Sequence, residues 1–366
     1  MNITDITVNR YKNKEQDSYV GEILIITVKT DTAHEGIGFT SAQPGLGEIY
    51  ALIISQIIKP VIVGKNAMHN KDLWTSMYNA VPRRGGDGIL RNCIASIDFA
   101  LWDLKGKAAN LPVAALFGGV RDLIPTYANC AHHMPAKELA ERAASYVENG
   151  HKALKIRGTK SFVTPEEATR RVREVRAAIG PDVKLMVDVN GSWDVDTAIQ
   201  QLKAWEPYNV YWLEEPVDPA DIPGYARVRA RAGQTYIVGG EQHVGLLEHR
   251  HLIDDGHIDM VQPNAAMTGG ITDWLHIHAY ATARNIPVSP WDLQMVHLHL
   301  AAGLPNIKWI EYFMADNALL EFQTKLFSKT EQQEVVKDDG VYLAAPKLPG
   351  LGIGIDYAFA EKSLIS

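Results

Sequence analysis

The sequence predicts an α/β protein in which a closed (β/α)8 barrel follows a smaller α+β unit. After residue 122, short apolar segments alternate with amphipathic segments of helical spacing, which is typical of a parallel sheet. Eight such units follow one another within about 190 residues, which fits a closed barrel better than an open doubly wound sheet. No GxGxxG motif follows the first of these strands, so a dinucleotide-binding fold is not indicated.

The barrel strands are short apolar runs bounded by turn residues. We expect them at 124–130, 152–158, 184–190, 210–216, 236–242, 258–264, 286–291 and 307–312. Before the barrel, three segments have the pattern of a small antiparallel sheet, 3–9, 20–30 and 36–41, and helical spacing follows from about 46 to 117. The tail returns to a hairpin-like composition, so we expect it to rejoin the first unit. The predicted units are therefore residues 1–122, 123–335 and 336–366.

The composition is that of a soluble globular protein. Of 366 residues, 46% are hydrophobic and 22% are charged, and the net charge of −7 without a basic run argues against nucleic-acid binding. No apolar run reaches the roughly 18 residues of a membrane span, and the polar start is unlike a signal peptide. Cys93 and Cys130 lie outside any CxxC motif, so no disulfide framework is indicated. We expect a cytoplasmic protein that acts on a small molecule.

Three acidic residues stand at equivalent places on successive barrel strands. Asp188, Glu214 and Glu241 end the third, fourth and fifth predicted strands, about 26 residues apart. Each acid alone could be a rim charge or the N-cap of the next helix. Together they converge at the C-terminal mouth, where barrel enzymes have their active sites. Because clustered carboxylates repel, a hard cation is expected between them, with Mg²⁺ first and Mn²⁺ next.

Several motifs in order along the chain resemble the enolase superfamily, in its mandelate racemase/muconate lactonizing enzyme branch. They are ASIDFALWDLKGK, VDVNGSW, WLEEPV, GGEQ, QPNAAMTGGIT and LPGLGIGID. The resemblance implies a modified TIM barrel under a capping domain made by the N-terminal region and the C-terminal tail. It implies one Mg²⁺ on Asp188, Glu214 and Glu241, and a homo-oligomer. It also implies that the α-proton of a carboxylate substrate is removed to give a metal-stabilised enediolate. Glu311 stands where resembling enzymes have a glutamate on strand 8, and we expect it to be catalytic: if protonated, it could donate a hydrogen bond to the enediolate.

The second predicted strand carries two cations, Lys155 and Arg157. Strand side chains alternate, so both face the same side, which we expect to be the barrel mouth. The branch usually has Lys-x-Lys here, with the second lysine as the base. Arginine stays protonated, so Arg157 is a poor base but a good carboxylate anchor, and Lys155 is the residue of this pair that could accept a proton. The alternative is that both cations only neutralise the acidic site.

The sequence departs from the branch again on strands 6 and 7. Trp291 stands at the place of the usual histidine base, and Asn264 at the place of its aspartate partner. Candidate substitutes are Asp292, Gln294, His132, His133 and His243. The candidate substrate-binding residues are Asn190, Asn264, Trp291, His133 and Arg84, the last from the loop PRRGGDG, which could close on an anionic substrate.

These observations favour a Mg²⁺-dependent lyase of sugar acid catabolism that dehydrates an aldonate or aldarate to a 2-keto-3-deoxy acid. Dehydration needs one base at the α-proton and help for the β-hydroxyl to leave, which tolerates loss of one base. A racemase or epimerase needs a base on each face of the α-carbon, and no evident pair is present. A cycloisomerase comes third, and a non-catalytic barrel that binds metal and sugar acid stays open.

Overall fold

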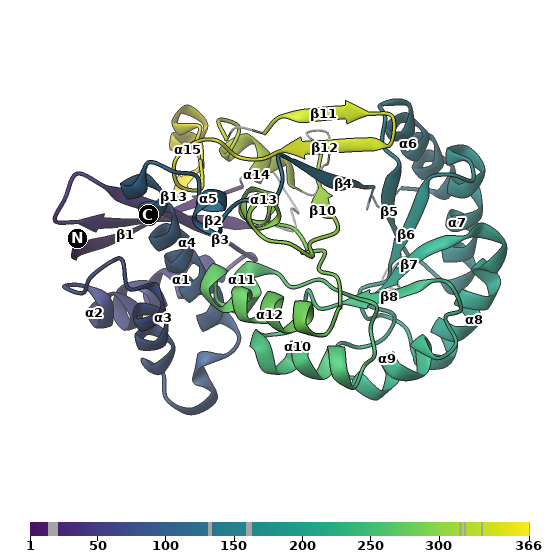
Figure 1. Cartoon of the computed structure of the whole chain (residues 1–366), viewed down its shortest axis with the longest axis horizontal. Coiled ribbons are helices and arrows are strands. Elements are labelled where there is room, and N and C mark those ends of the chain that lie inside the picture. The colour runs from purple at the N-terminus through teal and green to yellow at the C-terminus, as the bar shows by residue number, and fades with distance from the viewer. Residues whose placement is uncertain are drawn as a thin grey trace.

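A computed structural model describes residues 1–13, 21–130, 134–158, 163–314, 317, 320–330 and 332–365, apart from the side chain of Arg84. Figure 1 shows a sheet-and-helix unit that carries both chain ends, beside a ring of strands wrapped by helices. Among the residues described, no helix has the combined length and apolarity that a bilayer crossing needs.

The first unit contains a four-stranded antiparallel sheet in the order β13-β1-β2-β3. Its strands are β1 (Ile3–Lys12), β2 (Glu22–Thr30), β3 (Glu35–Ala42) and β13 (Leu364–Ile365). The helical segments are α1 (Gly47–Leu52), the π-helix η1 (Ile53–Ile58), α2 (Lys59–Ile62), α3 (Asn70–Asn79), the 3₁₀ turn η2 (Arg83–Gly86), α4 (Ile89–Ala109) and α5 (Val113–Leu116).

The long helix α4 lies against the sheet at very short range. A Cβ added at Gly36 or Gly38 of β3 would lie 1.9 Å from the carbonyl oxygens of Ala100 and Ser96. The two glycines in the sequence EGIGF are therefore required by the close approach of the helix backbone.

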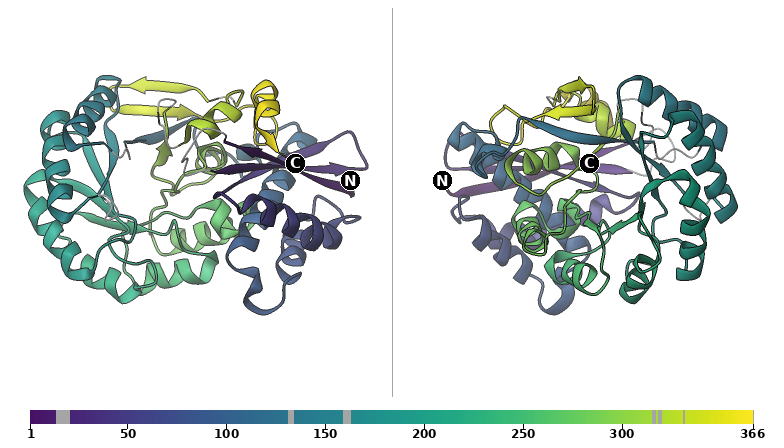
Figure 2. Two further views of the ribbon diagram at one scale, coloured as in Figure 1. Left: turned by 180° about the vertical axis from the view of Figure 1, so that it is seen from behind. Right: turned by 45° about the vertical axis from the view of Figure 1, so that its right-hand side comes forward.

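The barrel is built from parallel strands with helices outside, as Figure 2 shows from two further sides. Its strands are β4 (Leu123–Asn129), β5 (Ala153–Arg157), β6 (Lys184–Asp188), β7 (Val210–Glu214), β8 (Tyr236–Gly239), β9 (Met260–Val261) and β10 (Ile310–Tyr312). The helices between them are α6 (Ala136–Glu148), α7 (Pro165–Ile179), α8 (Val195–Trp205), the 3₁₀ turn η3 (Glu206–Tyr208), α9 (Ile222–Arg229), α10 (Gly245–Asp254), α11 (Ala265–Thr268), α12 (Ile271–Ala283) and α13 (Gln294–Gly303). β10 pairs with β4 and closes the barrel, so the predicted fold class is confirmed.

Side-chain caps mark the N-termini of two barrel helices. Thr164 caps α7 by accepting a hydrogen bond from the Glu167 N–H at 3.2 Å, and Pro165 occupies the first helical position. Asp194 caps α8 in the same way, accepting from the Thr197 N–H at 2.7 Å. Both caps lie beyond the C-terminal end of a strand, on the side of the barrel where the acids converge.

The seventh strand predicted at 286–291 is not a regular strand. Val288 forms only single bridges, to Val261 on one side and to Ile307 on the other. Pro287 and Pro290 flank this residue and have no N–H to donate, which explains why no longer ladder forms. The bridges still close the gap between β9 and β10.

The C-terminal segment divides between the two units. After α14 (Glu321–Leu326), the hairpin of β11 (Glu334–Lys337) and β12 (Gly340–Ala344) pairs antiparallel with residues 123–125 of β4. These residues precede the part of β4 that pairs with β5 and β10, so β12 satisfies backbone groups there. The later part contacts the first unit: Gly350 hydrogen-bonds with Leu111 and Val113, and after α15 (Tyr357–Ser363) the strand β13 pairs with β1. The boundaries at 122/123 and 335/336 stay a prediction.

The motif ASIDFALWDLKGK of α4 attaches the first unit to the barrel. Asp98 is fully buried and accepts hydrogen bonds from the Oγ1 and N–H of Thr272, at 2.6 and 2.8 Å, in the first turn of α12. Trp102 Nε1 donates to the same Thr272 hydroxyl at 3.0 Å. Burial raises the pKa of Asp98 to about 7, although the two Thr272 donors oppose the shift. Gly270 has a φ of 105°, and a Cβ there would meet Asp98 Oδ2 at 2.4 Å.

We expect Asp98→Ala to lower the free energy of unfolding by about 1–3 kcal/mol, because it leaves buried Thr272 donors without their acceptor. Thermal unfolding, followed by circular dichroism, measures the change. Asp182→Ala, at an exposed loop position, is the matched control and should unfold like the wild type. Equal unfolding midpoints for the two variants would show that this contact does not stabilise the attachment.

Candidate active site

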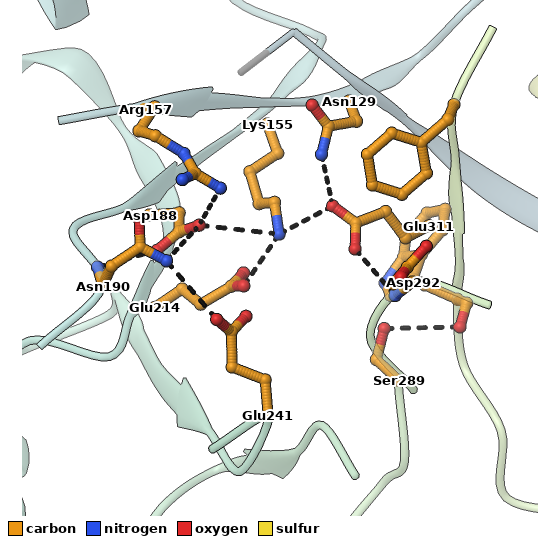
Figure 3. A network of polar contacts seen from close by, with 12 residues as sticks. Asn129, Lys155, Arg157, Asp188, Asn190, Glu214, Glu241, Ser289, Asp292 and Glu311 are labelled. Atoms are coloured by element: carbon orange, nitrogen blue, oxygen red, sulfur yellow. Dashed lines mark hydrogen bonds and ion pairs between the residues drawn. The ribbon is translucent and has the colours of Figure 1, made fainter. Parts of the chain in front are cut away.

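Three carboxylates meet at the C-terminal mouth of the barrel. Asp188 and Glu214 are the last residues of β6 and β7, and Glu241 follows β8 by two residues. All three are buried, and one oxygen from each lies within 4.8 Å of the others. Figure 3 shows the three side chains pointing toward one another. The structure thus brings together the three acids that the sequence predicts to meet at the mouth of the barrel.

The environment of this cluster fits a divalent cation. Burial raises the pKa of Glu241 well above its ordinary value, and the nearby acids Glu215 and Asp188 raise it further. Its Oε2 atom is buried and has no hydrogen-bond partner among the residues described. An orphaned carboxylate oxygen beside two other carboxylates, with no nitrogen or sulfur donor among the three, matches the ligand preference of a hard ion.

Lys155 supplies positive charge to the same cluster from β5. Its side chain is fully buried, and Nζ lies 2.7 Å from Glu214 Oε1 and 2.8 Å from Glu311 Oε1. Burial acts to lower the pKa of Lys155, but these carboxylates outweigh it and hold the pKa well above the ordinary value. Without a cation in the cluster, Lys155 is therefore a paired ammonium group.

Arg157 lies on the same side of β5, as the strand alternation predicts. Its Nη2 atom is 3.4 Å from Asp188 Oδ2, and 19% of its side chain is exposed. Burial acts to lower its pKa, but Asp188 and the other acids raise it, so the guanidinium stays charged. Its Nε atom is buried with no hydrogen-bond partner in the described part of the chain. This side chain can anchor an anion but cannot accept a proton.

Glu311 accepts hydrogen bonds through both carboxyl oxygens. Oε1 accepts from Asn129 Nδ2 at 2.6 Å and from Lys155, and Oε2 accepts from the Asp292 N–H at 3.1 Å. All these partners are donors, so both oxygens of Glu311 act as acceptors here. A neutral Glu311 that donates to the substrate, as expected from the sequence, would have to give up one of these contacts.

The five candidate substrate-binding residues have different surroundings. Asn190 Nδ2 donates to Asp188 Oδ2 at 3.2 Å and to Glu241 Oε1 at 3.4 Å, so it holds two of the carboxylates. Asn264 caps α11, with Oδ1 accepting from the Ala266 N–H at 2.7 Å, and its side-chain oxygen is engaged there instead of in the mouth. Trp291 is half-buried, with Nε1 lacking a partner among the described residues. His133 and the Arg84 side chain lie outside the described residues.

The candidate substitutes for the missing base also differ in their surroundings. Gln294 is engaged structurally, because it accepts from the Phe313 N–H and donates to Gln332. His243 is buried, and burial lowers its pKa to about 3. His132 lies outside the described residues, and Asp292 contacts Glu311.

Three further residues complete the site and were not expected from sequence. Asn129 ends β4 and holds Glu311, so the rule that strand ends meet at the mouth could have found it. Trp212 Nε1 donates to Glu214 Oε2 at 3.1 Å. Glu215 accepts from Gln242 Nε2 at 2.6 Å, which ties the residue after β7 to the turn that carries Glu241.

Two family matches cover most of the chain. Residues 13–118 match the mandelate racemase/muconate lactonizing enzyme N-terminal domain, and residues 138–359 match the enolase C-terminal domain-like family. The two matches leave residues 119–137 between them.

Similar proteins of known name agree with these matches. The chain is 34% identical over 307 residues to an L-talarate/galactarate dehydratase of Salmonella typhimurium, covering 83% of this chain and 76% of the relative. The structure of an L-talarate dehydratase from Polaromonas sp. JS666 with Mg and L-glucarate has a TM-score of 0.84 at 30% identity and covers 99% and 97% of the two chains. A 3,6-anhydro-D-galactonate cycloisomerase from Zobellia galactanivorans has a TM-score of 0.87 at 29% identity, with full coverage of both chains.

The order of capping sheet and barrel, the acids that end three successive strands and the two family matches lead to one conclusion. The chain belongs to the mandelate racemase/muconate lactonizing enzyme branch of the enolase superfamily.

Proposed function

We propose that this chain dehydrates a sugar acid, an aldonate or aldarate, to a 2-keto-3-deoxy acid with the help of Mg²⁺. The observation that carries the proposal is the buried cluster of Asp188, Glu214 and Glu241 beside the cations of β5. The names of the similar proteins, which include several sugar acid dehydratases, support this class of substrate and reaction.

Magnesium is the cofactor, and Asp188, Glu214 and Glu241 are its ligands. Asn190 keeps two of these carboxylates in place through its amide hydrogen bonds. When bound, the ion stabilises the negative charge that forms on the substrate carboxylate and offsets the acids that hold Lys155 protonated. One oxygen of each residue already lies within 4.8 Å of the others, so the three ligands face one place.

Lys155 and Arg157 have different roles toward the substrate. Lys155 is the base that removes the α-proton, and Glu214 and Glu311 fix the position of its amine. Arg157 is the anchor for the substrate carboxylate, because its planar guanidinium remains charged and part of it is exposed. Glu311 is an acceptor that orients Lys155 and Asn129.

Dehydration fits the site better than racemisation does. The indole of Trp291 has no basic nitrogen, and Asn264 is committed to capping α11, so these two positions offer no base for the second face of the α-carbon. Cycloisomerisation is the second candidate, since the similarity to a cycloisomerase structure is as extensive as that to the dehydratases. Assembly into a homo-oligomer and a cytoplasmic location stay predictions.

A screen of aldonates and aldarates with Mg²⁺, followed by detection of 2-keto acids, tests the reaction. We expect turnover with at least one sugar acid, and loss of turnover on addition of a chelator. Asp188→Ala should lose stoichiometric Mg²⁺ binding in calorimetry together with turnover, because it removes a charged ligand of the ion. Asp182→Ala is the exposed control. Wild-type Mg²⁺ affinity in the Asp188→Ala protein would show that the ligand set is wrong.

Exchange of the substrate α-proton with deuterated solvent tests the base. Lys155→Met should lower exchange by about 10²- to 10⁴-fold, the usual contribution of a general base. Arg157→Lys should keep exchange but raise KM, because it retains the charge and loses the planar fork. Lys152→Met, three residues earlier and exposed, is the matched control. Exchange at the wild-type rate in folded, Mg²⁺-binding Lys155→Met protein would assign the base elsewhere.

A further inference from the structure

The carboxyl group of Asp292 lies at the active site, and the roles proposed above do not use it. Asp292 follows Trp291 in the segment between Val288 and α13, and its backbone N–H donates to Glu311 Oε2 at 3.1 Å. Figure 3 shows it against Glu311, on the far side of Lys155 from Asp188 and Glu241. Asp292 therefore lies opposite the carboxylate cluster, across the ammonium group of Lys155.

The side chain of Asp292 has an unsatisfied oxygen. Asp292 is only partly exposed, and its Oδ1 atom is buried with no hydrogen-bond partner among the residues that the structure describes. Buried polar atoms are nearly always paired in folded proteins, and an unpaired carboxyl oxygen is costly to maintain. An oxygen left open next to a reaction centre is available to a substrate hydroxyl.

The backbone that carries Asp292 is held in an unusual conformation. Asp292 and Leu293 both have left-handed φ values, 53° and 43°, which are sterically unfavourable for a branched residue such as leucine. His297 fixes this turn, because its Nδ1 lies 2.6 Å from the Asp292 carbonyl oxygen and its Nε2 accepts from the Ala265 N–H at 3.2 Å. The turn is thus braced from α13 and from the start of α11, and the position of the carboxyl is set by the fold.

The charges around this carboxyl allow it to hold a proton near neutral pH. Burial raises the pKa of Asp292 to about 7, with a further rise from Glu311 on β10. The Leu293 N–H and the ammonium of Lys155 on β5 oppose the shift. Burial lowers the pKa of His297 to about 4, so His297 is neutral and adds no charge on the side of α13. Asp292 can therefore be an acid at the pH at which Arg157 is a fixed cation.

We propose that Asp292 is the general acid of the reaction, which gives its proton to the β-hydroxyl as that group leaves. The inference rests on the proposed dehydration and adds a second catalytic residue to it. Lys155 takes the α-proton as the C–H bond breaks. The electron pair forms the new C=C bond, the β C–O bond breaks, and the hydroxyl leaves as water with the Asp292 proton. The enol then tautomerises to the 2-keto-3-deoxy acid, and exchange with solvent returns the proton from Lys155 and restores that on Asp292.

The Asp292→Asn variant separates the two half-reactions. It keeps the shape of the side chain and removes the proton that can be given. We expect α-proton exchange within a few-fold of the wild type, and 2-keto acid formation lower by about 10²- to 10⁴-fold. Asp182→Asn makes the same chemical change at an exposed position and should leave both rates unchanged. Mg²⁺ binding and thermal unfolding establish that the variant is folded and holds its ion.

Two further measurements distinguish proton donation from positioning. The wild-type kcat should fall as pH rises above about 7, since the donor is the protonated form, and this limb should be absent in Asp292→Asn. A 3-deoxy-3-fluoro sugar acid releases fluoride without needing a proton. With this substrate Asp292→Asn should eliminate at close to the wild-type rate, which a variant with a merely distorted site would not do.

Each contrary result has a definite meaning. Dehydration at the wild-type rate in Asp292→Asn would overturn the assignment, and so would loss of exchange together with loss of fluoride release. If the wild type neither exchanges nor dehydrates any sugar acid, the proposed function itself fails, and the inference fails with it. An active wild type with an unimpaired Asp292→Asn protein leaves the proposed function standing and removes only Asp292 from it.

Discussion

The arrangement of the site depends on the balance of charge around one buried ammonium group. Lys155 Nζ contacts Glu214 and Glu311 directly, and Asp188 Oδ2 is 4.0 Å away. Removing one partner from such a buried set leaves charge uncompensated, which typically costs about 3–5 kcal/mol. The cations of β5 therefore have a structural role whatever else they do, because they allow acids from β6, β7 and β10 to be buried side by side.

The barrel supplies this balance through the ends of its strands. Asn129, Asp188 and Glu214 are each the last residue of a strand. Just beyond two of these ends the chain turns with left-handed φ values, 45° at Asn190 and 43° at Glu215. Non-glycine residues in this conformation are strained, and they persist where the surrounding structure fixes them. Here the fixing contacts are hydrogen bonds: Asn190 donates to the strand-end carboxylate of Asp188, and Glu215 accepts from Gln242 through its own carboxyl group.

The sequence was sufficient for the parts that follow from periodicity and from parallel pairing. The alternating units predict the barrel, and strand ends that share one edge predict that Asp188, Glu214 and Glu241 meet. Contacts that depend on a few tenths of an ångström could not be predicted, such as the pairing of Lys155 with Glu311. The turn at Asp292 and Leu293 could not be predicted either, since aspartate adopts a left-handed φ only occasionally and leucine rarely does. The irregular segment around Val288 could be predicted in part, because Pro287 and Pro290 already argue against a full strand.

The pairing of β13 with β1 has a consequence for how the molecule is assembled during synthesis. Leu364 and Ile365 lie beside Tyr11 and Arg10, so residues from opposite ends of the sequence share one sheet and the barrel is an insertion between β3 and β13. The barrel sequence leaves the ribosome before the strand that completes the sheet of the first unit. The fourth strand, β13, can therefore join β1 only after the whole barrel has been synthesised. A chain that lacked these last residues would keep the three strands β1, β2 and β3 but would leave the edge of β1 without its partner at Arg10 and Tyr11.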